Sequence, residues 1–307
     1  MHGLKKMSSS LWCRIGVTVG VAVTLASAAL APVAGQQGGS MQCRPDGPVA
    51  AIPEVPEASG IALSRRVPGR FWTHNDSGQP DLFSLDARGS VTGRLRLSGV
   101  TVEDWEAVAV GPCPGGSCVY IADIGDNDAT RKRITIYRFP EPSRSETSVV
   151  VKDIIHGKYP DGAHDAEAFF VTSDGGLFIV TKGDAGPVAL YRFPRQVRPG
   201  STHPLERVGQ PRGSGTPVKS ERITDGAVSA NGEWIVLRTG QHLTFHRAAE
   251  LLAGNWRGAA QVDLKAVGEA QGEGVAIGDD DTVYLASEGG GRSRPGTFAR
   301  LVCSVNP

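Results

Sequence analysis

Two glutamates frame the segment GEGVAIGDDDTVYLASEGG, and their positions raise the possibility of shared chemistry. Glu273 precedes a short apolar run, Asp279 and Asp280 belong to the turn, and Glu288 follows a second apolar run. This pattern predicts a β-hairpin, in which the start of the first strand lies beside the end of the second. The two carboxylates are therefore expected to be neighbours, and neighbouring like charges need a cation or a proton between them. The group between them could be a metal ion, a substrate or only water.

The hairpin belongs to a pattern that recurs along the chain. Each unit has a small or polar residue, an apolar strand, a turn rich in Gly, Pro, Asn or Asp, and a second strand that ends in charged residues. The units begin at ASGIALS, DWEAVAVG, DAEAFFVT, ITDGAVSA and GEGVAIG. Five units of three or four strands predict an all-β fold, a single β-propeller with five blades. Six blades are the alternative, if VKDIIHGKYP or LERVGQP belongs to a degenerate blade.

Composition agrees with this fold class. The chain has 307 residues, of which 40 are Gly and 20 are Pro, and only 6% are aromatic. Many turn residues between short apolar runs are typical of an all-β domain. The formal net charge is +0, which indicates no polyanionic partner, and we expect no binding to nucleic acid.

The N-terminus has the features of a targeting segment. Basic residues precede an apolar stretch over 15–34, which predicts a signal peptide over 1–35. A leader over 36–48 and a propeller domain over 49–307 are expected to follow. An uncleaved membrane anchor is the alternative. We predict a secreted or periplasmic monomer that has no membrane contact after the signal peptide is cleaved.

Four cysteines follow the signal segment, an even number that is typical of disulfides in an oxidising compartment. Cys113 and Cys118 flank the short loop PGGS, which favours a local bridge. Cys43 is then left to pair with Cys303, near the other end of the chain. The last unit has only three strands, and the segment 49–55 could supply its outer strand. A Cys43–Cys303 bond would then lock the closed ring and protect sheet edges.

Propeller geometry predicts which side chains meet at the channel mouth. The first strand of each blade lines the channel, so its first residue faces the mouth. The residues at this position are Ser59, Glu106, Glu167, Asp225 and Glu273. The ends of the second strands lie on the same face and contribute His74, Asn75, Asp76, Asp123, Asp126, Lys182, Arg238 and Glu288. Carboxylates gathered around a narrow axis repel one another unless a cation or basic groups neutralise them.

An oxygen-only set of donors favours Ca²⁺, which takes six to eight oxygen ligands in a flexible arrangement. The predicted ligands are Asp76, Glu106, Asp123, Asp126, Glu167, Asp225, Glu273 and Glu288. Zinc is disfavoured, because the histidines are scattered and the cysteines are expected to form disulfides. The alternative is that the acids only cap strand ends and accept hydrogen bonds from turn amides.

One segment resembles a known family. EGVAIGDDDTVYLASE is similar to a blade of the calcium-dependent β-propeller phytases, which combines a Glu-Gly pair, a short strand, an Asp-rich turn and a Tyr-Leu/Ile-Ala-Glu strand. The wider pattern resembles secreted propellers of the phytase-like and gluconolactonase-like group. The resemblance implies a Ca²⁺-binding mouth with Glu273 and Glu288 as ligands or water-positioning groups, and basic side chains nearby. It covers about one blade, and the chain departs from the family at Gly289, where a second acid is common, and in its five blades instead of six.

Three classes of function remain open. The first is a metal-assisted hydrolase of phosphoesters, or of lactones or esters, with Glu273 and Glu288 in catalysis and His74 as proton shuttle. The residues expected to bind its small anionic substrate are Lys182, Arg238 and Asn75. The second is a glycosidase with two carboxylates, which the few aromatic residues disfavour. The third is a non-catalytic propeller that binds a ligand or an extracytoplasmic protein, which stays open because no G-x-S-x-G motif is present.

Overall fold

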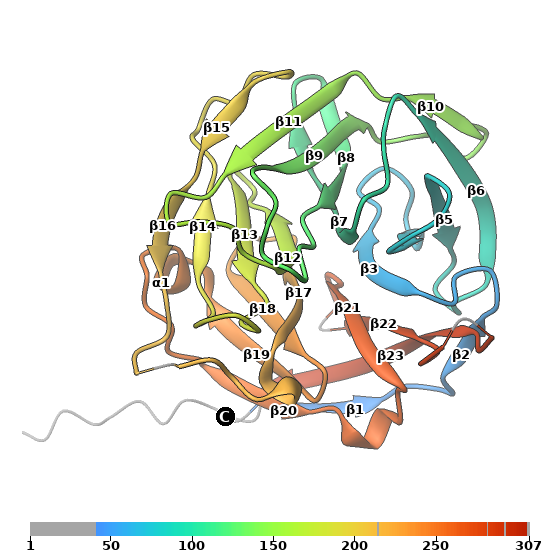
Figure 1. Ribbon diagram of the computed structural model, residues 1–307. Helices are drawn as coiled ribbons and strands as arrows, with labels where there is room; N and C mark the ends of the chain where they lie inside the picture. The colour runs from blue at the N-terminus through green and yellow to red at the C-terminus, as the bar shows by residue number, and fades with distance from the viewer. Residues whose placement is uncertain (1–40, 214, 281, 292, 306–307) are drawn as a thin grey trace, which may run out of the picture. The chain divides into compact units, whose positions relative to one another are not determined.

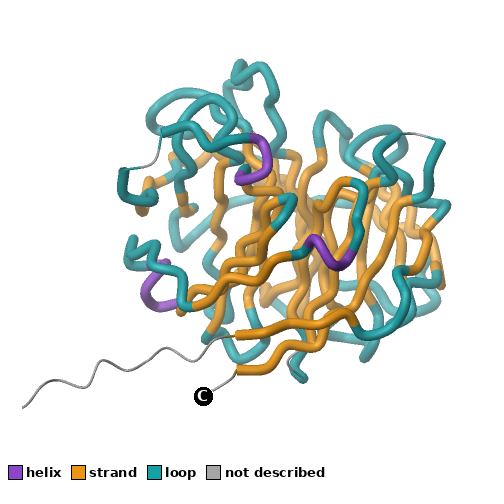
Figure 2. The backbone as a smooth tube through the Cα atoms, turned by 90° about the horizontal axis from the view of Figure 1, so that it is seen from below, coloured by secondary structure: helices purple, strands orange, loops and turns teal. Residues whose placement is uncertain are grey.

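The computed structural model describes residues 41–305, except positions 214, 281 and 292. These residues belong to one compact unit, Gly38–Pro307. The predicted signal peptide and residues 36–40 of the predicted leader lie outside the described residues. Strands dominate the unit (Figure 2), and its helices are short: η1 (Lys219–Glu221), α1 (Ala248–Leu252) and η2 (Lys265–Val267). In this part of the chain, no helix is long and apolar enough to span a membrane.

Five sheets surround one axis, as Figure 1 shows, and the inner strands of each sheet are antiparallel. The innermost strands of the five sheets are β3 (Ala58–Leu63), β7 (Trp105–Cys113), β12 (Ala166–Val171), β17 (Ile223–Val228) and β21 (Gln271–Ile277). Each inner strand contacts the inner strands of both neighbouring sheets, including β21 with β3, so the ring is closed. The prediction of an all-β, five-bladed β-propeller is confirmed.

The outer strands follow each inner strand in order. The first blade continues with β4 (Phe71–Asn75), β5 (Asp81–Leu85), β6 (Val91–Ser98) and β10 (Ser148–Val150). The second continues with β8 (Gly116–Asp123), β9 (Ile134–Pro140), β11 (Asp153–Lys158) and β15 (Thr202–Pro204). The third has β13 (Leu177–Thr181), β14 (Leu190–Arg192) and β16 (Glu206–Gly209), and the fourth β18 (Trp234–Thr239), β19 (His242–Arg247) and β20 (Ala260–Asp263).

The two segments on which the alternative of six blades depended form outer strands of the second and third blades. VKDIIHGKYP contains β11, which pairs with β9, and LERVGQP contains β16, which pairs with β14. β10 and β15 are parallel additions to the first and second blades. Each comes from the chain beyond the blade that it joins, so neighbouring blades are tied together by shared segments.

The fifth blade is built from both ends of the described chain. It contains β22 (Thr282–Glu288), β23 (Gly296–Val305), β1 (Met41–Pro45) and β2 (Ala50–Ile52). β2 pairs with β23 as the sequence predicted for the segment 49–55. β1, which lies within the predicted leader, pairs along the rest of β23. Residues 41–45 thus belong to the fifth blade, as a strand that the sequence did not reveal because β1 is only five residues long and weakly apolar.

Both predicted disulfides are present. Cys43 bonds to Cys303, its direct cross-strand partner between β1 and β23. Cys113 bonds to Cys118 across the β7–β8 turn. The long-range bond thus joins the first and last strands of the ring.

Predicted turn chemistry is also confirmed, for example between β12 and β13. Gly175 has a φ of 81°, a left-handed conformation that glycine adopts without strain. The backbone N–H of Gly176 donates to Thr172 Oγ1 at 3.0 Å and to Asp174 Oδ1 at 3.3 Å. These bonds close the turn and fix the register that carries Glu167 to the mouth.

Candidate active site at the acidic mouth

β-bulges at the start of three inner strands set the direction of three glutamates. In β7, β12 and β21 the pairing with the second strand shifts by one residue. The residues that this shift leaves unpaired are Glu106, Glu167 and Glu273. A bulge bends its strand and re-aims the extra side chain. All three glutamates are buried, and Glu106 lies close enough to the other two for mutual repulsion.

The other two blades place uncharged residues at the bulge. In β3 the shift spans Ser59, whose hydroxyl donates to Glu106 Oε2 at 3.1 Å. In β17 the unpaired residue is Thr224, whose hydroxyl donates to the carbonyl oxygen of Glu273 at 3.1 Å. Both hydroxyls therefore support neighbouring acidic blades.

The expected position of Asp225 is corrected by one residue. Asp225 pairs in register with Arg238 and is buried. Its carboxylate accepts hydrogen bonds from the backbone N–H of Gly226 at 2.7 Å and of Val275 at 2.8 Å. Asp225 thus joins the fourth blade to the fifth. The Asp-Gly pair in ITDG resembles the Glu-Gly pair in GEGV. The sequence therefore aligned Asp225 with Glu273, although the bulge residue of β17 is Thr224.

Lys182 is the cation that lies among these acids. Its Nζ forms an ion pair with Glu167 and lies 3.2 Å from Asp165 Oδ2. Burial alone would lower the pKa of Lys182, but Glu167 and Asp165 raise it above its usual value. Lys182 is therefore charged, and its charge is committed to two carboxylates.

One lysine does not neutralise the acids around it. Burial raises the pKa of Glu167 to about 7, against the opposing effect of Lys182. Burial, followed by the charge of Glu167, raises the pKa values of Glu106 and Glu273 well above their usual range. Burial, Asp76 and Glu57 raise the pKa of Glu288 to about 7. The mouth therefore holds protons near neutral pH and would release them to a cation.

Three acids of the mouth were missed by sequence reasoning. Glu57, Asp104 and Asp165 each come two residues before the bulge residue of their blade, in EAS, DWE and DAE. The repeated acid-x-Glu spacing of the last two was a usable signal. Burial, then Asp165 and Asp123, raises the pKa of Asp104. Burial, then Glu57, raises the pKa of Asp76 to about 6.

His74 does not lie where a proton shuttle would. It is 0% exposed and packs edge-on against Trp105. Burial lowers the pKa of His74 to about 4, so the ring is neutral at physiological pH. The neighbouring Asn75 accepts a hydrogen bond from the backbone N–H of Glu57 at 3.0 Å, which orders the approach to β3. The sequence could not reveal that β4 turns His74 inward.

Arg238 is also unavailable to a substrate, because it is 0% exposed. Its guanidinium donates to the carbonyl oxygens of Gly274 and Ala286 and to Glu269 Oε2, the last at 2.6 Å. These partners lie in the fifth blade or just before it. Arg238 therefore fastens the fourth blade to the fifth from within.

The packing of Arg238 leads to a prediction for Gly272. A Cβ atom on Gly272 would lie 3.0 Å from Arg238 Cζ and closer still to Nη2. We expect Gly272→Ala to lower the free energy of unfolding by about 1–3 kcal/mol, as overpacking of a filled site does. Urea unfolding would measure it against Gly240→Ala, where the new Cβ meets nothing within 4 Å. Equal stability of the two variants would contradict the clash.

Asp123 and Asp126 order the loop between β8 and β9. Asp123 accepts bonds from the backbone N–H groups of Glu103 and Asp104, each at 3.2 Å, and pairs with Arg131 at 2.8 Å. Asp126 accepts from the backbone N–H groups of Thr130 and Arg131. Both carboxylates are thus already bonded, which corresponds to the capping alternative for these two residues.

The mouth meets a test for a cation only in part. Glu167 Oε2 and Asp76 Oδ1 are buried and have no hydrogen-bond partner in the described chain, and carboxylate oxygens are the ligands that Ca²⁺ prefers. Among the same residues, however, no group of three or more His, Cys, Asp or Glu side chains is arranged to hold a metal. Lys182 forms an ion pair with Glu167, the glutamate that would be central to such a group.

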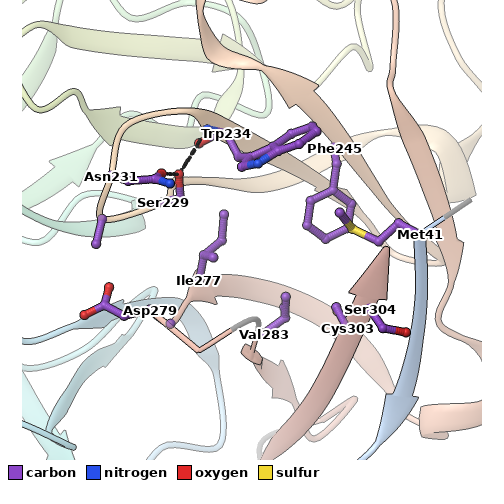
Figure 3. Close-up of a pocket in the computed structure, with 12 residues that line it drawn as sticks. Met41, Ser229, Asn231, Trp234, Phe245, Ile277, Asp279, Val283, Cys303 and Ser304 are labelled. Atoms are coloured by element: carbon purple, nitrogen blue, oxygen red, sulfur yellow. Dashed lines mark hydrogen bonds between the residues drawn. The ribbon is translucent and has the colours of Figure 1, made fainter. Parts of the chain in front are cut away.

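Cavities away from the mouth offer less chemistry. One of about 460 Å³ is lined by the far halves of the five inner strands, and most of its lining residues are apolar. Another of about 350 Å³ lies between the fourth and fifth blades, where Trp234, Phe245, Val283 and Asp279 are among the lining residues (Figure 3). Asp279 is its one acidic side chain among the described residues, so no acid–base pair forms there. The acidic mouth is the better candidate for an active site.

Comparisons with known proteins support the fold. No family model matches the sequence, and no curated protein matches it. The PQQ-bound aldose sugar dehydrogenase from Streptomyces coelicolor is 12% identical, with a TM-score of 0.51 over 87% of this chain and 99% of that one. This similarity concerns the fold alone. A gluconolactonase from Xanthomonas campestris is 10% identical, with a TM-score of 0.43 over 84% of this chain and 95% of that one. A streptogramin B lyase is 13% identical, with a TM-score of 0.40 over 84% and 98%.

Proposed function

We propose that the protein is a hydrolase of lactones or other neutral esters, assisted by a divalent cation, Ca²⁺, at the acidic mouth. The observation that carries this proposal is the convergence of Glu106, Glu167 and Glu273 from three blades, all buried with raised pKa values. A cation that replaces the shared protons would relieve the repulsion between these carboxylates.

The donor set favours a hard cation. Glu167 and Glu273 offer carboxylate oxygens, and Glu167 Oε2 has no hydrogen-bond partner in the described chain. Lys182 pairs with the other oxygen of this carboxylate, Glu167 Oε1, so Oε2 would be the oxygen that holds the cation. A bound divalent cation supplies Lewis acidity, which polarises a carbonyl group and lowers the pKa of water.

The charge of the mouth favours a neutral substrate over a phosphoester. Lys182 is paired with two carboxylates, and Arg238 is buried with its bonds made inside the protein. A phosphate group would therefore meet uncompensated acids. A lactone or ester carries no net charge at the reacting carbonyl and avoids this repulsion.

Glu288 is the best candidate for a general base. It ends β22 and is only partly buried, unlike the glutamates on the bulges. Its pKa of about 7 suits proton transfer near neutral pH. Glu273, on the paired strand β21, would hold the cation, and His74 has no part in this scheme.

A substrate panel tests the proposal. We expect calcium-dependent turnover of lactones and aryl esters by the purified protein, and none of phosphomonoesters or inositol phosphates. Glu288→Gln should lower kcat by about 10²-fold or more, as loss of a general base does, and should remove the rise of kcat between pH 6 and 8. Glu233→Gln, an exposed residue on the β17–β18 turn, is the matched control. Turnover that survives in Glu288→Gln would refute its role.

A non-catalytic binding module is the second candidate. The absence of a preformed metal group among the described residues favours it, because a catalytic ion usually meets a ready set of ligands. Ca²⁺ binding without turnover on any ester would decide for this candidate. The two disulfides support a location in an oxidising compartment, and we propose that the protein acts as a secreted or periplasmic monomer.

A further inference from the structure

A second polar cavity lies between the first and second blades. It has a volume of about 520 Å³ and is lined by residues 99–101, Glu103, residues 131–133 and side chains of β9 and β11. These strands begin or end at the same face of the propeller as the acidic mouth. Arg131 forms the wall between the two sites, because it lines the cavity and pairs with Asp123.

The β9–β11 register assembles the floor of this cavity. Thr135 pairs with His156, and Tyr137 pairs with Ile154. Residues two apart on a strand point to the same face, so these four side chains share one side of the sheet. A ring nitrogen of His156 lies 3.1 Å from Thr135 Oγ1. Tyr137 is held by Thr101, whose hydroxyl lies 2.9 Å from the phenol oxygen.

Positive charge in the cavity is left without a partner. Arg131 pairs with Glu103 at 3.1 Å, which uses the one acidic side chain among the described lining residues. Lys132 and Arg133 are exposed, and in the described chain neither forms an ion pair. Arg133 and His156 both line the cavity, and burial and then the charge of Arg133 lower the pKa of His156.

We propose that this cavity binds a tetrahedral oxyanion, the phosphate or sulfate group of a small monoester. Lys132 and Arg133 would supply the charge, and the imidazole of His156 and the hydroxyl of Thr135 would donate hydrogen bonds. Cations that converge from one loop are stabilised by an anion with several oxygens, and arginine suits such an anion. A polyanion is disfavoured, because the adjacent mouth is acidic and would repel its extended charge.

This site is independent of the proposed hydrolase activity, and its test needs neither calcium nor a lactone. Inorganic phosphate, sulfate and glycerol 2-phosphate are titrated separately into EDTA-treated protein at pH 6.5. Binding is followed by calorimetry and by the NMR signals of the His156 ring. The double variant Lys132→Ala/Arg133→Gln removes the proposed charge, and Arg257→Gln, an exposed residue of the fourth blade, is the control.

We expect saturable binding, a rise in the pKa of His156 on addition of the anion, and at least tenfold weaker binding in the double variant only. Preference for glycerol 2-phosphate over sulfate would identify a phosphate site, and the reverse a sulfate site. Linear shifts without saturation, or equal binding by all variants, would mean an adventitious ion only and would overturn the proposal. Far-UV circular dichroism of the double variant confirms that it is folded.

Discussion

Replacing Cys43 and Cys303 together with serine is expected to lower the free energy of unfolding by about 5 kcal/mol. The bond spans 260 residues of sequence, so its loss frees a very long loop in the unfolded chain. It also joins β1 to β23 at a directly paired position, where the ring closes. Urea unfolding under non-reducing conditions measures the difference.

The second disulfide is an internal control for this effect. Cys113 and Cys118 are only 5 residues apart, and the same loop-closure relation gives about 2 kcal/mol for so short a loop. We expect Cys113→Ser/Cys118→Ser to fold with a small loss, and Cys43→Ser/Cys303→Ser to unfold at markedly lower urea. Equal losses in the two double variants would show that ring closure does not depend on the long-range bond.

Calcium and pH are expected to act on stability through the same carboxylates. A group whose pKa is raised in the folded state contributes stability at low pH, and this contribution is lost as pH rises through the folded value. For Glu167 and Glu288 the window runs from their unfolded pKa, about 4.5, to about 7. In EDTA, the protein should therefore become less stable between pH 5 and pH 8, by on the order of 3 kcal/mol from the buried Glu167 alone.

Ca²⁺ should cancel this loss at pH 8 and have little effect at pH 5, where protons already neutralise the mouth. At a concentration 100 times Kd, an ion adds about 2.7 kcal/mol. Thermal unfolding at both pH values, with EDTA or with Ca²⁺, measures the coupling, and Glu106→Gln or Glu273→Gln should reduce it. Asp263→Asn, at an exposed position of β20, should behave as the parent. Melting that depends on neither pH nor EDTA would mean that these acids are solvated strand ends.

Local sequence signals were sufficient for the architecture. Turn residues at regular intervals predicted the blades, because each blade is a meander whose pairings are mostly between consecutive strands. The PGGS loop predicted the Cys113–Cys118 bond, and elimination left Cys43 for Cys303. The inner-strand pattern also placed Glu106, Glu167 and Glu273 at equivalent positions, because each is followed by Ala or Gly at the start of an apolar strand.

Burial and partner choice required the structure. Arg238 and His74 have the same repeat position as Lys182 and Glu288, which are partly exposed, yet both are 0% exposed. Whether a charged side chain faces solvent or an adjacent blade depends on packing between sheets that are distant in sequence. Asp225 was misplaced for a related reason, since a one-residue bulge shift reverses the face on which a side chain lies.

The construction of the fifth blade from both chain ends governs the order in which the molecule can fold. Its partners β1 and β23 are the first and last strands of the described chain, so their contact has a very high sequence separation. Contacts of this kind form late, because the intervening chain must be ordered first. During synthesis β1 has no partner until β23 has been made. Unpaired strand edges are sites of misassembly. We therefore expect ring closure to be a late step of folding, and a chain shortened before β23 to expose an unpaired sheet edge.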